Sequence, residues 1–243
     1  MDSFDLSKAP LEFQEWTNTS VYIHLYTNVT WVIVYVGLIQ RSIQDRSYAM
    51  PLFSQCFNIA WEITFGFIFP TDDWGVTAFF QLAVIINSVV TYTGIRYGSR
   101  EWDHAPMVKR NLPMIYAAGI GTSLACYMGI AKQFGRTKAC FMIAIILQAI
   151  LSVGSLSQLL TRGSTRGFSF SLWFLRFTGS LALVPEFYLR VQHWHEDFGF
   201  LASPLMLWCC YIFLGFDLVY GVCFWYIKQY EQGGRMAQVQ KKQ

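Results

Sequence analysis

The sequence is dominated by long apolar runs separated by short polar connections. Each run is about 20 residues long, which is the length that a helix needs to cross the hydrocarbon core of a bilayer. The connections leave no room for a second folded unit. We therefore predict one all-α membrane domain over residues 1–243, a seven-transmembrane helix bundle with spans at about 22–40, 49–69, 76–97, 112–131, 139–160, 169–189 and 202–226.

The positive charges fall unevenly on the two sides of this predicted bundle. Of the 18 Lys and Arg residues, twelve lie in the connections and the C-terminal tail of one side, five lie on the other side, and Arg176 lies within the sixth run. Cytoplasmic connections of membrane proteins carry the excess of Lys and Arg. The pattern predicts a cytosolic C-terminus and a lumenal N-terminus.

Composition supports the membrane class and excludes several others. Hydrophobic residues make up 54% of the chain and charged residues 14%, whereas a soluble domain carries about 25% charged residues. The net charge of +3 is spread over the connections and gives no footprint for nucleic acid. All six cysteines fall inside apolar runs, which is typical of small hydrophobic side chains and favours neither a disulfide framework nor a metal site.

Few ionisable side chains lie inside the predicted spans. Glu62 is the only formal charge in its run, and a carboxyl group at such a depth costs a few kcal/mol. Desolvation favours its neutral form, which is a proton donor held out of water. Asp217 could face Glu62 across a shared cavity, or it could form an ion pair with Arg176. Glu186 lies near the lumenal end of its span and is expected to reach toward the interface. Pro185, inside the same span, is expected to kink the helix.

Polar and aromatic neighbours surround these groups along the sequence. Asn58 lies one helical turn before Glu62 and could orient its carboxyl group, and Tyr220 lies one turn after Asp217. Asn87, Thr91 and Gln148 are expected to make polar contacts between helices. Aromatic faces stabilise cations in dry surroundings, although a mid-span aromatic residue also serves plain packing. The aromatic candidates for such a lining are Trp61, Phe65, Trp173, Phe216 and Tyr220. Asn58 and Arg176 are the polar candidates for substrate binding.

Several motifs are absent from the sequence. All seven lysines lie outside the predicted membrane core, so no lysine is placed to form a retinal Schiff base. No aspartate-rich DDxxD motif supports metal-triggered ionisation of a diphosphate, and no DxDD acid motif is present. Gly163 and Gly167 lie at the wrong spacing for a phosphate-binding loop.

Several blocks spread over nearly the whole chain point together to one known family. They are Asn58-Ile59-Ala60-Trp61-Glu62, Glu101-Trp102-Asp103-His104-Ala105-Pro106, Lys109-Arg110-Asn111-Leu112-Pro113, Ser164-Thr165-Arg166-Gly167, Leu172-Trp173 with Arg176-Phe177, and Cys223-Phe224-Trp225-Tyr226. With these blocks the sequence resembles the fungal integral-membrane terpene cyclases of meroterpenoid and indole-diterpene (paxilline-type) biosynthesis. The resemblance implies a seven-helix protein of the endoplasmic reticulum that protonates an epoxide on a prenyl chain and directs polyene cyclisation. It also implies that the two essential acids of that family correspond to Glu62 and Asp217 here.

The sequence leads to the hypothesis of a membrane-bound terpene cyclase that needs no cofactor and no metal. Its expected substrate is an epoxidised, prenylated (farnesylated) aromatic or polyketide-derived molecule, supplied by an upstream prenyltransferase and epoxidase with which the chain could associate. Glu62 or Asp217 would donate the proton while the other tunes it, and no residue is assigned as the final base. A rival hypothesis is a seven-helix transporter or receptor that uses Glu62, Arg176 and Asp217 as a proton relay or ligand site, and a weaker one is a non-catalytic membrane scaffold.

Overall fold

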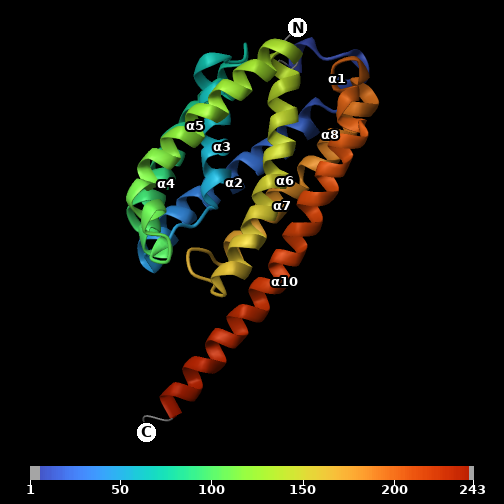
Figure 1. Cartoon of the computed structure of the whole chain (residues 1–243). Helices are drawn as coiled ribbons and strands as arrows, with labels where there is room; N and C mark the ends of the chain where they lie inside the picture. Colours follow the sequence, from blue (N-terminus) through green and yellow to red (C-terminus); the bar gives the residue numbers. More distant parts are fainter. Residues whose placement is uncertain (1–5, 241–243) are drawn as a thin grey trace.

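The computed structural model describes residues 6–240, which are almost entirely helical and contain no strand (Figure 1). Lys241 and Lys242, which the charge count included, lie outside the described residues. The elements in chain order are η1 Leu6–Lys8, α1 Leu11–Gln14, α2 Thr17–Asp45, α3 Leu52–Ile63, the π-helix η2 Thr64–Ile68, α4 Trp74–Gly98, η3 Ser99–Trp102, α5 Pro106–Phe134, α6 Arg136–Arg162, α7 Phe170–Leu181, α8 Leu183–His193, α9 His195–Phe198, η4 Gly199–Ala202 and α10 Pro204–Gln240.

Within the described residues, five helices are long and apolar enough to cross a membrane: α2, α4, α5, α6 and α10. The predicted second span is built from α3 and the π-helix η2, and the predicted sixth span from α7 and α8. The all-helical membrane bundle is therefore confirmed. The count of seven crossings and the orientation of the termini stay predictions.

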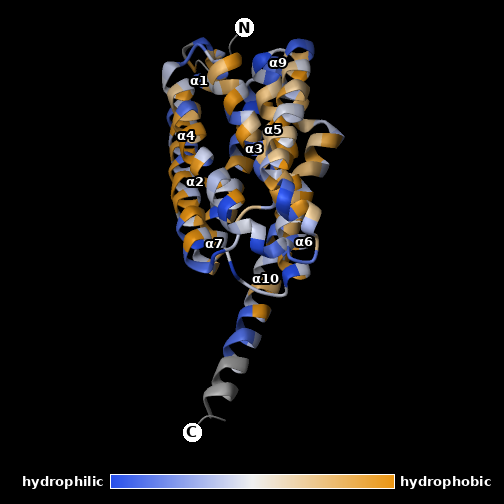
Figure 2. Cartoon of the chain, turned by 60° about the vertical axis from the view of Figure 1, so that its left-hand side comes forward, coloured by the Kyte–Doolittle hydropathy of each residue, from blue (hydrophilic) through white to orange (hydrophobic). Residues whose placement is uncertain are grey.

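The helices run side by side, and α10 extends beyond one end of the bundle, opposite the end that holds α1 and α9 (Figure 1). α6 packs along α10, α3 along α5, and α2 contacts both α4 and α7. Figure 2 shows hydrophobic residues along the length of the bundle, with hydrophilic residues gathered at its ends and on the projecting part of α10. This distribution is the one that a bilayer selects.

The interruption between α7 and α8 has a cause in the sequence. Proline lacks an N–H, and its ring crowds the carbonyl four residues earlier. Pro185 therefore acts on Leu181, the last residue of α7. The chain breaks at Ala182, and α8 begins at Leu183. The kink predicted from Pro185 is confirmed as a break in the helix three residues before the proline.

A single residue joins α5 to α6. Gly135 lies between Phe134 and Arg136 and has a φ of 82°, a left-handed value that glycine adopts without steric cost. Its N–H donates to the carbonyl of Ala131, which satisfies one of the last acceptors of α5. The turn keeps α5 and α6 adjacent and directs α6 back through the bundle beside α3.

Candidate active site

Glu62 lies one residue before the end of α3 and is only 1% exposed. The π-helix η2 begins two residues later, at Thr64. Such local widening of a helix occurs frequently at functional sites. Ala60 and Phe65, both fully buried, pack into a hydrophobic cluster on either side of Glu62 in the chain. The carboxyl group is thus held inside the protein by tightly packed neighbours.

The two carboxyl oxygens of Glu62 have different surroundings. Oε1 accepts hydrogen bonds from Tyr35 Oη at 3.1 Å, Asn58 Nδ2 at 3.2 Å and Asn87 Nδ2 at 2.7 Å. Asn58 Nδ2 also donates to Tyr35 Oη at 2.9 Å. Oε2 has no hydrogen-bond partner among the residues that the structure describes. The three donors therefore converge on one oxygen.

A second layer of hydrogen bonds fixes the direction of the Asn87 amide. Gln55 Nε2 donates to Asn87 Oδ1 at 3.2 Å and to Thr91 Oγ1 at 2.9 Å. Thr91 Oγ1 donates in turn to the Asn87 carbonyl at 2.8 Å. Because Asn87 Oδ1 accepts from Gln55, its Nδ2 is turned toward Glu62. Residues of α2, α3 and α4 thus join in one directed network that ends on the Glu62 carboxyl group.

Glu62 belongs to the wall of a cavity of about 580 Å³, a size within the usual range for small-molecule sites, roughly 300–1,000 Å³. Residues from α2, α3, α4, α6, α7, α8 and α10 line it, and most of them are apolar. Trp61 lies on this wall and is held by a hydrogen bond from its Nε1 to the Cys140 carbonyl at 3.1 Å. The other aromatic residues on the wall are Trp31, Tyr35, Phe79, Phe80, Phe141, Phe187 and Phe213.

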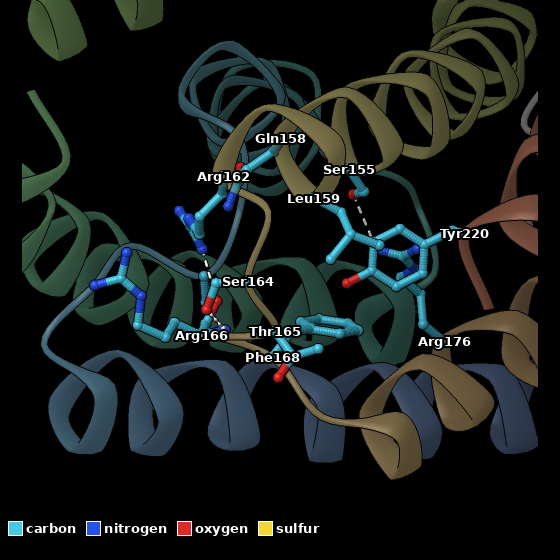
Figure 3. A pocket seen from close by; sticks show the side chains of 11 residues that line it. Ser155, Gln158, Leu159, Arg162, Ser164, Thr165, Arg166, Phe168, Arg176 and Tyr220 are labelled. Carbon is cyan, nitrogen blue, oxygen red and sulfur yellow. Dashed lines mark hydrogen bonds between the residues drawn. The ribbon is translucent and has the colours of Figure 1, made fainter. Parts of the chain in front are cut away.

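Asp217 lies elsewhere in the bundle, on α10. It is fully buried and forms an ion pair with Arg176 of α7. Arg176 also donates to Ser155 Oγ at 3.0 Å, and its guanidinium lies over the rings of Tyr220 and Phe168. Figure 3 shows Arg176 beside Tyr220 with its hydrogen bond to Ser155. The site is a buried ion pair enclosed by aromatic rings.

The prediction that Glu62 and Asp217 face one another across one chamber is wrong. Glu62 lines the large cavity, and Asp217 is not among its lining residues. The alternative expectation, an ion pair between Asp217 and Arg176, is confirmed. A buried carboxylate without a cation is costly, so the guanidinium of Arg176 decides where the Asp217 carboxylate points.

The residues expected to support the acids divide between these two places. Asn58 and Trp61 line the large cavity with Glu62, and Phe65 packs on Trp61 behind the wall. The other residues expected to line the cavity do not line it. They surround the ion pair or pack in the core beside it. They are Trp173, whose Nε1 donates to the Asp217 carbonyl at 2.8 Å, together with Arg176, Phe216 and Tyr220.

Three residues around Glu62 were not assigned to the site from the sequence. Tyr35 lies in the middle of the first predicted span and gave only the weak signal of a mid-span tyrosine. Asn87 and Thr91 were expected to make contacts between helices, and those contacts prove to lead to Glu62. A run of polar residues at 55, 58 and 62 of α3 was the available signal, because positions three and four apart share one helix face.

Glu186 was expected to reach toward the interface, and this expectation is wrong. Its carboxyl group is fully buried, and Oε1 accepts hydrogen bonds from Arg190 Nε and from Ser20 Oγ, both at 2.6 Å. Arg190, one turn later on α8, lies against the rings of Phe13, Phe141, Trp194 and Phe198. Arg190 on the same helix neutralises the Glu186 carboxylate, so Glu186 can stay buried without contact with water.

The fold and the site define a class: a helical membrane protein with a buried acid at the wall of a large, mainly apolar cavity. Comparison with known proteins identifies the family within it. Residues 4–230 match the model of the Pyr4-like transmembrane terpene cyclases. The chain therefore belongs to this family of cyclases of fungal meroterpenoid and indole-diterpene biosynthesis.

Relatives match this chain over nearly its full length. It is 42% identical to terpene cyclase janB of Penicillium janthinellum over 99% of each chain. It is 40% identical to terpene cyclase atmB of Aspergillus flavus and 40% identical to terpene cyclase paxB of Penicillium paxilli, over 96% of each chain in both cases. No solved structure matches the chain significantly.

Proposed function

We propose that this cyclase opens a terminal epoxide by proton transfer from Glu62 and guides the cationic cyclisation that follows. The substrate is a prenylated, for example farnesylated, aromatic or polyketide-derived molecule. One observation carries the proposal: a fully buried carboxyl group, with one oxygen saturated by donors and the other unpartnered, lies at the wall of a cavity of about 580 Å³.

The hydrogen-bond inventory supports a defined position for the proton. Oε1 already accepts from three donors, so a neutral Glu62 carries its hydrogen on Oε2. When that proton moves to the epoxide oxygen, a carboxylate remains. Tyr35, Asn58 and Asn87 then stabilise its negative charge without rearranging, because they already point at the group. The same network thus holds the acid before the transfer and its conjugate base afterwards.

The wall of the cavity suits the cation that epoxide opening releases. Trp31, Trp61, Phe79 and Phe80 contribute aromatic surface, and an aromatic face stabilises a desolvated cation by about 2 kcal/mol. Trp61 and Phe80 pack edge to face with ring centroids 4.9 Å apart, which fixes their orientation. A cavity lined in this way also keeps water from the cation before the rings are closed.

Asp217 acts, in this proposal, as a positioning residue. Its carboxylate neutralises Arg176, whose guanidinium lies 5.0 Å from the centre of the Tyr220 ring. Tyr220 and Tyr35 belong to the same buried hydrophobic cluster, and Tyr35 donates to Glu62. Loss of Asp217 would leave an uncompensated cation beside this cluster and disturb the residues that hold the proton donor.

The surroundings of the reaction belong to the same proposal. We place the chain in the endoplasmic reticulum membrane with seven crossings, the α3–η2 and α7–α8 segments included, a lumenal N-terminus and a cytosolic C-terminus. The chemistry derived from Glu62 calls for no cofactor and no metal. The prenyltransferase and the epoxidase that make the substrate act before it and could associate with it in the membrane.

The test is Glu62→Gln in microsomes supplied with an epoxyfarnesylated aromatic substrate. The amide keeps the size of the side chain but cannot donate an acidic proton, so we expect the cyclised isomer of equal mass to disappear while the protein level is unchanged. Glu12→Gln, at an exposed position of α1, is the matched control and should cyclise normally. Substantial cyclisation by Glu62→Gln would overturn the assignment, and transport of unaltered substrate by the native protein would favour a transporter.

A further inference from the structure

The cavity has a second polar end, distant from Glu62. Of the eight α2 residues that line the cavity, five follow one another at spacings of three or four: Ser20, His24, Asn28, Trp31 and Tyr35. These five therefore lie on one face of the helix. Tyr35 donates to Glu62. His24 lies 11 residues earlier, which places it about 16 Å nearer the start of α2 at 1.5 Å per residue. The proton donor and His24 therefore mark opposite parts of one cavity.

His24 offers an unused hydrogen-bond acceptor at this end. Its Nδ1 lies 3.2 Å from the Ser20 carbonyl oxygen. A carbonyl can only accept, so Nδ1 carries the hydrogen in this contact, and Nε2 of the neutral imidazole presents a lone pair. No hydrogen bond to Nε2 occurs within residues 6–240. Because 35% of its side chain is exposed, His24 remains accessible to a ligand.

The ion pair beneath His24 makes no hydrogen bond to the ring. Glu186 Oε1 lies 2.6 Å from Arg190 Nε but 3.7 Å from His24 Nδ1, which is beyond hydrogen-bond distance. The Glu186 carboxylate is thus paired with Arg190 at closer range than with His24. Ser20 Oγ donates to the same Glu186 carboxyl group. The Glu186–Arg190 pair thus also holds Ser20 in place, and the Ser20 carbonyl in turn bonds to the His24 ring.

Ser180 of α7 provides an independent sign of a missing partner. It lines the cavity and is 2% exposed, yet its hydroxyl makes no hydrogen bond in the part of the chain that the structure describes. Thr27, three residues after His24 on α2, donates through Oγ1 to the carbonyl of Gly179 at 3.1 Å, and Gly179 directly precedes Ser180. Buried polar groups are nearly always hydrogen-bonded, so this hydroxyl on the cavity wall is free to bond to a ligand.

We propose that this end of the cavity binds the polar head group of the prenylated substrate. An N–H or O–H of the head donates to His24 Nε2, and the hydroxyl of Ser180 bonds to a second polar atom of the head. The prenyl chain then runs along Trp31 toward Tyr35, with its epoxide at Glu62. The inference rests on the proposed cyclase function and adds that the substrate class has a hydrogen-bond donor on its head.

The test uses two probes, an indole that carries a terminally epoxidised farnesyl chain, with its ring N–H free or methylated. Their dissociation constants are measured with detergent-solubilised full-length protein in a Glu62→Gln background, where no turnover occurs. We expect His24→Phe to weaken binding of the N–H probe about fivefold, the effect of one hydrogen bond, and to leave binding of the N-methyl probe unchanged. Ser180→Ala should weaken both probes. His104→Phe, at an exposed loop histidine, is the matched control and should weaken neither.

The N-methyl probe also reports on folding, since a misfolded His24→Phe protein would bind neither probe. Equal weakening of both probes, or weakening of neither, would overturn the inference. A second result, obtained with Glu62 intact, would also overturn the inference. If His24→Phe changes the product or lowers kcat for both probes, His24 removes a proton from the cation and does not bind the head group. A native protein that binds the N–H probe more tightly yet forms no cyclised product would refute epoxide protonation while leaving the head-group site in place.

Discussion

In the proposed mechanism, the position of the acidic hydrogen on Glu62 depends on donors from three helices. Tyr35 of α2, Asn58 of α3 and Asn87 of α4 all donate to Oε1, and Gln55 holds Asn87 in the direction that makes this possible. Hydrogen bonds to a charged group are worth about 1.5–3 kcal/mol each. Each donor should therefore matter for the rate of proton transfer more than for substrate binding.

Tyr35→Phe removes one of these donors and keeps the ring. We expect kcat to fall about 10- to 100-fold, the kinetic equivalent of a hydrogen bond to a charged group, while KM stays nearly constant because the hydroxyl contacts the acid and not the substrate. Steady-state cyclisation kinetics in microsomes measure both quantities. Tyr127→Phe, another buried tyrosine, is the control. An unchanged kcat for Tyr35→Phe would remove the donor network from the mechanism.

The ion pair of Arg176 and Asp217 makes a second prediction at this scale. Asp217→Leu leaves a buried guanidinium without its partner, which should destabilise the protein by about 3–5 kcal/mol. The double variant Arg176→Met with Asp217→Leu replaces the pair by apolar side chains and should recover most of that stability, together with part of the cyclase activity. Thermal unfolding of the solubilised protein and product formation are the measurements. A stable but inactive double variant would give Asp217 or Arg176 a direct chemical role.

At the scale of the elements, the interruptions of helices position the site residues as much as the helices do. The π-helix η2 begins two residues after Glu62. The break at Ala182 divides α7, which carries Ser180 and Arg176, from α8, which carries Glu186 and Arg190. The packing of α7 on α10 is close, because Gly221 of α10 lies directly against the indole of Trp173. That indole donates to the Asp217 carbonyl one turn earlier on α10.

Gly221→Ala should therefore separate α7 from α10. A Cβ at this position collides with the Trp173 ring, and overpacking of this kind costs about 1–3 kcal/mol. Gly215→Ala is the matched control in the same helix, since nothing lies within 4 Å of its added Cβ. Alanine favours a helix by about 1 kcal/mol over glycine, so the control should be neutral or slightly stabilised. Equal unfolding temperatures for the two variants would contradict this packing.

At the scale of the whole molecule, the helices enclose a cavity that no single pair of them could form. Among the described residues, seven α-helices and the short helix η1 contribute to its wall. α10 continues beyond the bundle at the end away from α1 (Figure 1). The distribution of Lys and Arg predicts that this projecting end lies in the cytosol. The end of α2 that carries Ser20 and His24 would then face the lumen.

Protease treatment of sealed microsomes tests this orientation. An epitope tag after Gln243 should be digested in intact microsomes, and a tag before Met1 should be protected until detergent is added, because the positive-inside rule directs the C-terminus to the cytosol. A resident lumenal protein that stays undigested is the control for sealed vesicles. Protection of the C-terminal tag, or digestion of both tags, would refute an odd number of crossings with this orientation.

Length and hydropathy alone determined the class of this protein. Runs of about 20 apolar residues can remain in a bilayer only as helices, because no water is present there to satisfy the backbone. The same pattern made Glu62 conspicuous, since a carboxyl group in such a run is costly and needs a reason. Pro185 marked the break between α7 and α8 in advance because its effect on a helix is local.

The tertiary structure decided which of these groups meet. Hydropathy fixes how deep a residue lies but leaves open how each helix is rotated, so it could not tell that Asp217 turns to Arg176 while Tyr35 and Asn87 turn to Glu62. Rotation is set by side-chain packing between helices far apart in the sequence. For the same reason the cavity, and the place of His24 and Ser180 on its wall, became visible only when the helices were assembled.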